Sequence, residues 1–395
     1  MTDPLIQLKD QVCAAVDGER DRLIELSRRI HAHPELCFAE HQASTWLADY
    51  LEHVGYQVER GACELPTAFI ARIGSGAPRV GVLCEYDALP GIGHGCGHNI
   101  IATAGAGAGA ALGRVVERTG GSVVIFGTPA EEGGGGKIVM ARRGAFADID
   151  AAMMVHPAGA DLPAMHVLAV ATIVVTYHGK AAHAAAFPHR GINALDALIT
   201  AYNTIAQLRQ HIRETERIHG IITDGGQAPN IVPDHAAGLF YIRAATEGRL
   251  EKLKTRVLGC FRAGAEATGA RLEYHWEGEQ YSDMDSNQPL ADAYTANLQR
   301  LGRTMLDMRN VPAAVSGSTD MGNLSKLVPS IHPMIASAPA TVPLHSTEFA
   351  ECAASPSGDQ AVVDGAKALA MTALDVLCRP EFRAEIRAAF EGGDR

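Results

Sequence analysis

This sequence has no apolar run that approaches the roughly 20 residues needed to span a membrane. It also has no basic segment followed by an apolar one near its first residue, so we expect no secretory signal. Basic residues are in the minority, with 34 Lys and Arg against 45 Asp and Glu, and the formal net charge is -11. This acidic balance argues against nucleic-acid binding, which requires a basic face.

Cysteines with paired spacing are lacking as well. Eight Cys are scattered over 395 residues. In a chain of this length, that usage predicts the reduced thiols of a cytoplasmic protein and not a disulfide framework. What the sequence does contain is 47% hydrophobic residues, enough for a large core, over a length that suggests two domains or one domain with an insertion.

Alternating strand and helix patterns predict an α/β fold with a mostly parallel sheet and helices on both faces. Buried strands are expected at residues 68–73, 80–84, 122–127 and 151–155. From about residue 167 the order becomes strand, helix, strand, strand, helix, strand, which is a ferredoxin-like βαββαβ unit. We therefore expect a catalytic domain of residues 1–166 and 284–395, interrupted by an inserted domain of residues 167–283.

A glycine-rich turn carries the first candidate site. The stretch DALPGIGHGCGHN, which ends at Asn99, follows the apolar strand at 80–84 and precedes a helix of small residues. Cys96 and His98 would thus lie beyond the carboxyl end of a strand, where open α/β sheets bind their ligands. A thiolate and an imidazole suit Zn²⁺ and related ions. An isolated Cys-x-His pair, however, is more often a buried cysteine and a loop histidine.

The next two strand ends carry Glu131-Glu132 and then His156. One carboxylate of the pair can bind a metal while the other takes a proton from a metal-bound water. Taken singly, these residues are better explained as a solvated acidic turn and an ordinary hydrogen-bonded histidine, and the glycine run after Glu132 lacks the spacing of a phosphate loop. Together with Cys96, His98 and the distant His345, they are five ligands that can hold two metal ions around a shared bridge.

The inserted segment has its own candidates in His183, Asn230 and Arg243. Each has a structural explanation, as a turn histidine, a loop asparagine and a strand-edge arginine. As a set they offer donors for an oxyanion and for a substrate carboxylate.

These segments together resemble the metal-dependent amidohydrolase and peptidase family of aminoacylases, carboxypeptidases and desuccinylases. The resemblance extends from residue 24 to residue 377 and is carried by residues 85–99, 127–137, 182–188, 217–224, 229–234 and 317–322. Within that family, the chain is most similar to the branch of p-aminobenzoyl-glutamate hydrolase and the dipeptidase that cleaves β-alanyl-lysine type dipeptides.

The resemblance implies a role for each candidate in the first part of the chain. Cys96 would bridge two metals, and the other ligands would be His98, Glu132, His156 and His345. Glu131 would act as the general base. Glu85 and Asp87 stand where the family keeps carboxylates that orient a ligating histidine. Asn99 replaces an aspartate of many relatives, although the nearer branch also has asparagine there.

The resemblance also implies a homodimer through the inserted domain. His183 would cross the dimer to polarise the scissile carbonyl, and Asn230 and Arg243 would hold the carboxylate of the substrate. The insertion is also a candidate lid, and the sequence leaves open whether it closes over the site when substrate binds.

We therefore expect a two-metal amidohydrolase acting on a small-molecule amide, either an N-acyl or N-aroyl amino acid or a dipeptide, with a free carboxylate. The two divalent ions would be zinc or manganese, with cobalt and nickel as alternatives. The sequence leaves open an N-acyl amino acid deacylase with an apolar acyl pocket and a non-catalytic ligand-binding relative. No nucleic-acid or membrane partner is expected.

Overall fold

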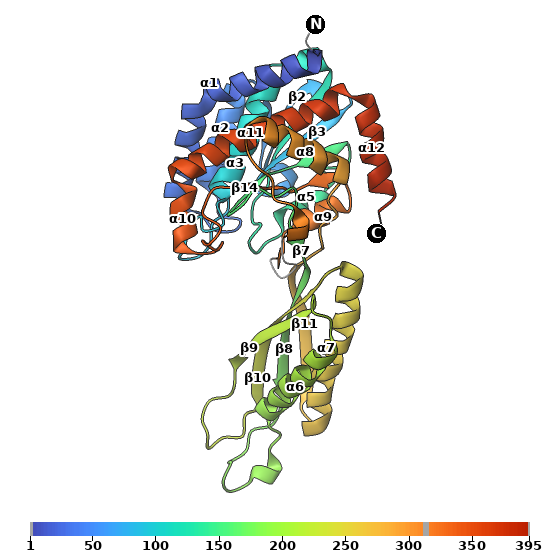
Figure 1. The fold of residues 1–395 in the computed structure, drawn as a ribbon. Helices are drawn as coiled ribbons and strands as arrows, with labels where there is room; N and C mark the ends of the chain where they lie inside the picture. The colour runs from blue at the N-terminus through green and yellow to red at the C-terminus, as the bar shows by residue number, and fades with distance from the viewer. Residues whose placement is uncertain (1–2, 311–315, 394–395) are drawn as a thin grey trace. The chain divides into compact units, whose positions relative to one another are not determined.

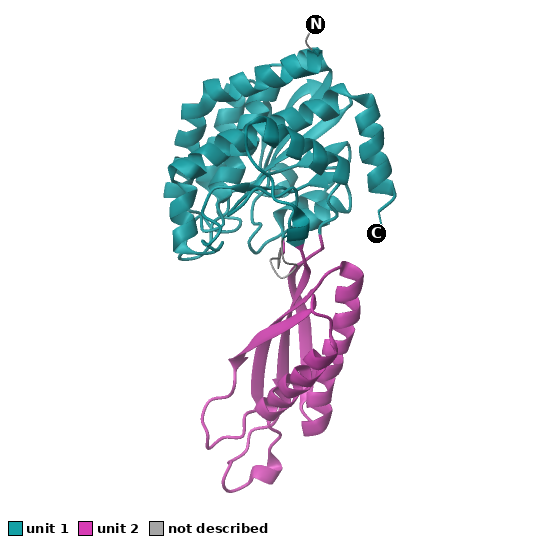
Figure 2. Cartoon of the chain, viewed as in Figure 1, with its two compact units in different colours: residues 1–166, 284–315, 319–395 teal, residues 167–283, 316–318 magenta. Residues whose placement is uncertain are grey.

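The computed structural model describes residues 3–310 and 316–393. Its contacts divide the chain into two compact units (Figures 1 and 2). Unit 1 consists of Met1–His166, Met284–Val315 and Thr319–Arg395, and unit 2 consists of Val167–Asp283 and Ser316–Ser318.

Unit 1 is built on a six-stranded sheet in the order β1-β2-β4-β3-β5-β13. The strands are β1 (Gln57–Arg60), β2 (Phe69–Ser75), β3 (Arg79–Cys84), β4 (Gly121–Gly127), β5 (Ala151–Met153) and β13 (Ser330–Ile331). The pairs β4–β3, β3–β5 and β5–β13 are parallel, whereas β1–β2 and β2–β4 are antiparallel. The predicted mostly parallel sheet is therefore confirmed, with an antiparallel edge.

Helices cover both faces of this sheet, as predicted. Val82 of β3 packs into a core with α1, α3 and α11, while its neighbour Leu83 packs into a second core with α5 and α9, because successive strand residues point to opposite faces. The helices are α1 (Pro4–Ala32), α2 (His41–His53), α3 (His98–Gly113), α4 (Val116–Thr119), α5 (Gly136–Arg142), α8 (Gln288–Arg300), α9 (Met321–Ser325), α10 (Thr347–Ala353), α11 (Pro356–Cys378) and α12 (Pro380–Glu391).

The glycines of α3 allow this helix to lie close against the sheet. A Cβ at Gly105 would lie 2.6 Å from Sγ of Cys84 and 2.8 Å from the carbonyl oxygen of Leu83. Glycine is unfavourable within a helix, and here close packing on β3 accounts for it. The helix of small residues ends at Gly113, and α4 follows as a separate turn.

Two strands of unit 1 are each followed, after a break of two residues, by a second short strand. The chain after β13 resumes as β14 (Met334–Ala336), and the chain after β5 resumes as β6 (His156–Ala158), which pairs in parallel with β14. Pro333 has no amide hydrogen and therefore cannot donate to the ladder. The break places His156 at the beginning of a short strand beyond the carboxyl end of β5.

Unit 2 has the predicted βαββαβ order. Its elements are β8 (Ala169–His178), α6 (Ala194–Leu208), β9 (Arg217–Asp224), β10 (His235–Ala244), α7 (Glu247–Thr268) and β11 (Arg271–Tyr281). All neighbouring strands in the order β11-β8-β10-β9 are antiparallel. Residues of β8 are buried alternately, so one face of the sheet forms a core with α6 and α7.

Shorter elements complete the described chain. They are β7 (His166–Val167), β12 (Ser316–Gly317) and the 3₁₀ helices η1 (Ala62–Glu64), η2 (Pro188–Arg190), η3 (Arg209–His211) and η4 (Met308–Asn310). All eight cysteines lie in the described part and are free thiols. Among the described residues, no helix combines the length and the apolar character needed to cross a membrane.

Candidate metal centre and active site

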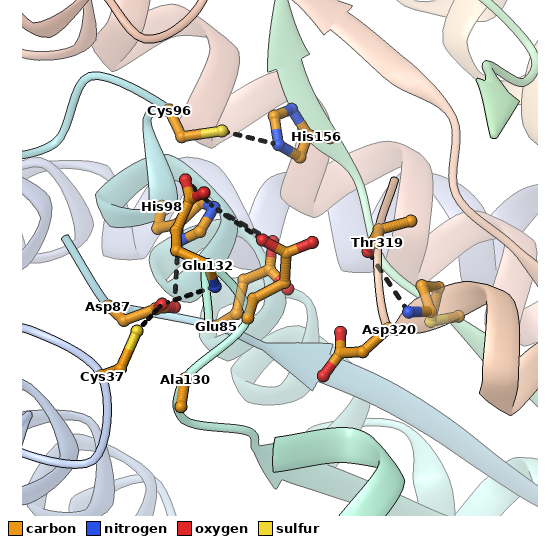
Figure 3. A network of polar contacts seen from close by, with 12 residues as sticks. Cys37, Glu85, Asp87, Cys96, His98, Ala130, Glu132, His156, Thr319 and Asp320 are labelled. Atoms are coloured by element: carbon orange, nitrogen blue, oxygen red, sulfur yellow. Dashed lines mark hydrogen bonds and ion pairs between the residues drawn. The ribbon is translucent and has the colours of Figure 1, made fainter. Parts of the chain in front are cut away.

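The first candidate ligands lie on the turn that connects β3 to α3 (Figure 3). Cys96 and His98 flank Gly97, whose φ of 75° lies in the left-handed region and which forms the N-cap of α3. A Cβ at Gly97 would also lie 2.6 Å from Cγ of Pro157, so both backbone conformation and space require glycine. The turn therefore holds a thiol and an imidazole beyond the carboxyl end of the central parallel strand.

Three other loops bring their ligands to the same place. The backbone amide of Glu132 donates to Oδ2 of Asp87 at 2.9 Å, which ties the loop after β4 to the loop after β3. The amide of His345 donates to the carbonyl oxygen of Gly95 at 2.9 Å. The ring of His156 meets that of His98 edge-on, with their centroids 5.9 Å apart.

The side-chain atoms of these residues form two clusters that share one thiol. Cys96, His98 and His156 form the first cluster, and Cys96, Glu132 and His345 form the second, with the possible ligand atoms of each cluster all within 4.8 Å of one another. Sγ of Cys96 lies 3.4 Å from Nε2 of His156, and Nε2 of His345 lies 3.4 Å from Oε1 of Glu132. A third cluster consists of Glu85, His98 and Glu131.

Two hydrogen bonds set the orientation of the histidine rings. Nδ1 of His98 lies 3.1 Å from Oδ1 of Asp87, and Nδ1 of His156 lies 2.8 Å from the carbonyl oxygen of Pro157. If each Nδ1 carries the proton, each Nε2 is left with a lone pair directed at the clusters. This is the arrangement that ligating histidines adopt in metal sites.

The donor set fits a pair of divalent metal ions. Nε2 of His98 and Oε1 of Glu132 are buried and form no hydrogen bond within residues 3–310 and 316–393, although each has an oppositely charged candidate ligand 3.4 Å away, Glu85 and His345 respectively. Buried polar atoms without a partner are rare and call for an explanation such as a bound ion. One thiol, imidazoles and a carboxylate are together typical of zinc and related transition metals.

Burial and neighbouring charges shift the pKa values of three candidate residues. Burial, together with the carboxylates of Glu85 and Glu132, raises the pKa of Glu131 well above its usual value. Burial also raises the pKa of the Cys96 thiol. Burial lowers the pKa of His156 to about 4, so this imidazole is neutral and available as a ligand at neutral pH.

Sequence reasoning missed two residues of this region, Lys137 and Asp320. Nζ of Lys137 donates to Oε2 of Glu85 at 2.6 Å and to Oδ1 of Asp320 at 2.7 Å, and all three side chains are fully buried. Although burial opposes it, the two carboxylates raise the pKa of Lys137. In the sequence, Lys137 ends a glycine-rich motif and Asp320 lies within a polar motif, and this was the only available signal. The pairing itself could not be predicted, because the contact joins residues far apart in sequence.

The side chain of Asn99 turns away from the ligands. Its Nδ2 donates to Oγ of Ser27 at 2.9 Å and to the carbonyl oxygen of Ala353 at 3.0 Å. Asp87 rather than residue 99 therefore supplies the negative charge next to His98.

Within one chain, the candidates of unit 2 occupy two different places. His183 and Ile231 form a β-bridge, and the amide of Ala184 donates to the carbonyl oxygen of Asn230 at 3.0 Å, so His183 and Asn230 lie on adjacent loop segments, both exposed. Arg243 lies on β10 and donates to Oγ of Ser318 at 2.8 Å.

The length of β10 keeps these two places apart. His235, at one end of β10, pairs with the last residue of β8, next to the loops of His183 and Asn230. Arg243 follows eight residues later, about 27 Å away along an extended strand. A single copy of unit 2 therefore does not bring Asn230 and Arg243 to the same group.

Comparison with known proteins shows that this chain is similar to peptidases and amide hydrolases. Residues 169–268 match the family model of the M20 peptidase dimerisation domain. The Xaa-Arg dipeptidase of Mus musculus is 39% identical over 398 residues, covering 97% of this chain and 92% of that protein. A p-aminobenzoyl-glutamate hydrolase chain of Escherichia coli (strain K12) is 36% identical, covering 73% of this chain and 64% of that protein.

Solved structures share the fold at lower sequence identity. A dinuclear metal binding peptidase of the M20 family from Bacillus subtilis superposes with a TM-score of 0.72 and 20% identity, covering 91% of this chain and 99% of that one. At this identity the likeness concerns the fold, including the inserted unit.

Replacing Lys137 by Met should destabilise the metal-free protein, because Glu85 and Asp320 would stay buried without their ammonium partner. Removing one partner of a buried ion pair costs about 3–5 kcal/mol. The loss should be smaller at about pH 5.5 than at about pH 7.5, since a buried acid whose pKa is raised destabilises the fold only once it ionises. Burial raises the pKa of Asp320 to about 6 even with Lys137 present, and removing the ammonium would raise it further.

Thermal unfolding at the two pH values measures this effect. Arg72→Met is the matched control, because the ion pair of Arg72 with Glu59 is exposed and should contribute less than about 1 kcal/mol. A Lys137→Met variant that loses the same stability at both pH values would contradict the assignment of the buried charges.

Proposed function

Because this chain belongs to the M20 peptidase family, we propose that it is a two-metal amidohydrolase acting on small amides with a free carboxylate. It is a hydrolase of amide bonds, as its relatives are. The observation that carries the two-metal proposal is the Cys96 thiol, which is common to two ligand clusters.

The residues that would hold the metals are divided between the two clusters. Cys96 would bridge, with His98 and His156 on one side and Glu132 and His345 on the other. When bound, two divalent ions supply a Lewis acid for the scissile carbonyl and lower the pKa of water at the site. Zinc and manganese are the ions we propose, with cobalt and nickel as alternatives.

Glu131 is the proposed general base. Its Oε2 lies 4.0 Å from Nε2 of His98, and its side chain is almost fully buried. Burial and the neighbouring carboxylates raise the pKa of Glu131, which brings the carboxylate closer in basicity to the water that it must deprotonate. Once protonated, it can return the proton to the leaving amine.

The proposed substrate is a dipeptide, or an acylated or aroylated amino acid, in which the leaving amine belongs to an amino acid. Two relatives are named for such amides, Xaa-Arg dipeptides and p-aminobenzoyl-glutamate. Arg243 is the candidate partner for the free carboxylate, because its planar guanidinium can bind a carboxylate through two hydrogen bonds. Its hydrogen bond to Ser318 holds it at the end of unit 2 where the chain enters and leaves.

A homodimer through unit 2 would supply the other two candidate donors, His183 and Asn230. The strand β9 is an edge of its sheet, with Ile221 61% exposed and Ile222 43% exposed. An edge strand with apolar side chains is a surface that pairs with another chain. We propose that such pairing brings His183 and Asn230 of one subunit to the metal centre of the other, since Arg243 lies at the opposite end of β10.

Amine release from a panel of amides tests the proposed activity. The panel contains dipeptides with C-terminal Arg or Lys, p-aminobenzoyl-glutamate, and N-acyl amino acids with apolar acyl groups. We expect turnover on at least one of the first two kinds, loss of turnover with a chelator, and recovery with Zn²⁺ or Mn²⁺. Preference for the third kind would favour the deacylase alternative, and bound metals without any turnover would favour a ligand-binding relative.

Glu131→Gln should lower kcat by roughly 10²–10⁴-fold, because the variant loses its general base. Its metal content, measured by elemental analysis, should match that of the wild type. Glu52→Gln, at an exposed position on α2, is the control. A Glu131→Gln variant with wild-type kcat would remove the general-base assignment.

Mixing two inactive variants tests the contribution across the dimer. Glu131→Gln and His183→Ala should each be inactive alone. After exchange of subunits, half of the dimers would be mixed and each would contain one complete site, so about one quarter of wild-type activity should return. No recovery, with subunit exchange verified by mass spectrometry, would show that His183 does not act across the dimer.

A further inference from the structure

The segment between α1 and α2 lies against both loops of the candidate active site. The amide of Ala88 donates to the carbonyl oxygen of Glu35 at 2.8 Å. The thiol of Cys37 donates to Oδ2 of Asp87 at 3.4 Å, which Figure 3 shows beside the candidate ligands. This segment therefore contacts the carboxylate that orients His98.

Glu40, at the end of the same segment, contacts the loop after β4. Its Oε1 accepts the amide of Phe38 at 2.9 Å and the amide of Ala130 at 2.9 Å, and its side chain is fully buried. Burial raises the pKa of Glu40 to about 7, and in either protonation state Oε1 can accept both amides. One carboxyl group thus joins two segments that are 90 residues apart in sequence.

The position of Glu40 would normally give it another role. It is the N-cap residue of α2, where a side chain usually accepts an amide of the first helical turn. Glu40 makes no such bond, and Glu35 instead accepts the amides of Gln42 at 2.9 Å and Ala43 at 3.0 Å. Glu35 therefore caps α2, and the side chain of Glu40 is free to bind the loop after β4.

Both amides held by Glu40 belong to residues with unusual backbone conformations. Ala130 has φ of 59° and Phe38 has φ of 60°, in the left-handed region that residues with a Cβ rarely adopt. Such conformations persist only where the surrounding structure fixes them, and they cluster at functional sites. Here the hydrogen bonds to the Glu40 carboxyl fix them.

Ala130 is also held from its other side. Its carbonyl oxygen accepts the amides of Gly134 at 3.0 Å and Gly135 at 2.8 Å. Ala130 immediately precedes Glu131 and Glu132, so its φ decides where the proposed base and a proposed metal ligand point. A change in φ at Ala130 would therefore reorient both carboxylates.

We propose that Glu40 is a positioning residue that holds Ala130 in the left-handed conformation and so directs Glu131 and Glu132 into the site. The inference rests on the proposed function for the roles of these two carboxylates. Glu40 itself touches neither substrate nor metal in this arrangement. It acts through the Ala130 amide.

Three variants separate positioning from simple stabilisation. Glu40→Ala removes the acceptor, Glu40→Gln keeps an amide oxygen in its place, and Glu35→Ala removes the neighbouring carboxylate that caps α2. We expect Glu40→Ala to lower kcat by about 10–100-fold, because small misplacements of catalytic groups have effects of this size. KM should change little, Glu40→Gln should keep most of the activity, and Glu35→Ala should lower thermal stability without lowering kcat.

Metal affinity provides a readout that does not depend on turnover. Titration of the metal-free protein with Zn²⁺ should show one of two sites weakened by about 10-fold or more in Glu40→Ala, as for other residues that orient ligands. Hydrogen exchange at Gly134 and Gly135 should also become faster. If the wild type shows no turnover on any amide, the proposed function fails while these two measurements still decide the role of Glu40.

A second substitution tests the mechanism at Ala130. Glycine adopts positive φ without steric cost, so Ala130→Gly in the Glu40→Ala background should recover part of the lost kcat and Zn²⁺ affinity. Glu40→Ala with wild-type kcat and Zn²⁺ affinity, whatever its thermal stability, would overturn the inference. A double variant with no recovery would also overturn it.

Discussion

The rest of the structure depends on holding several acidic side chains close together at the carboxyl edge of the unit 1 sheet. Five acidic residues converge there, and the buried ammonium of Lys137 is shared between two of them. The acids are Glu85, Asp87, Glu131, Glu132 and Asp320. Burying a charge is costly unless it is paired, so this site favours cations. The thiol and the imidazoles determine which cations fit, because they are softer ligands than oxygen alone.

The acidic side chains can bind cations only if they are held in place against their mutual electrostatic repulsion. Backbone conformations, as well as packing, hold these side chains in place. Gly97 turns the chain between Cys96 and His98, and Ala130 turns it before Glu131. Hydrogen bonds from the amides of Glu132 and Ala130, both on the loop after β4, then connect this loop to Asp87 and to Glu40. The ligands thus lie on short loops attached to a rigid sheet, an arrangement that combines precise geometry with access for a substrate.

The two units divide the proposed chemistry between them. Unit 1 holds every candidate metal ligand and the proposed base, whereas unit 2 holds candidates for substrate recognition. The strand β10 separates Arg243 from His183 and Asn230 within one copy. A dimer is therefore more than a source of stability in this proposal. It would allow donors from opposite ends of the same small domain to meet at one substrate, each from a different subunit.

The α/β class and the βαββαβ order were predicted from the sequence, because hydrophobic periodicity is local and each strand and helix carries its own. The family and the class of enzyme followed from short motifs, and the comparisons confirmed both. The roles of the eleven site residues stay predictions. Only the tertiary structure decided that Lys137 binds Glu85 and Asp320, that Asn99 turns away from the ligands, and that Glu40 holds Ala130. Each of these contacts joins residues at least 50 positions apart, where no local pattern indicates which side chain meets which.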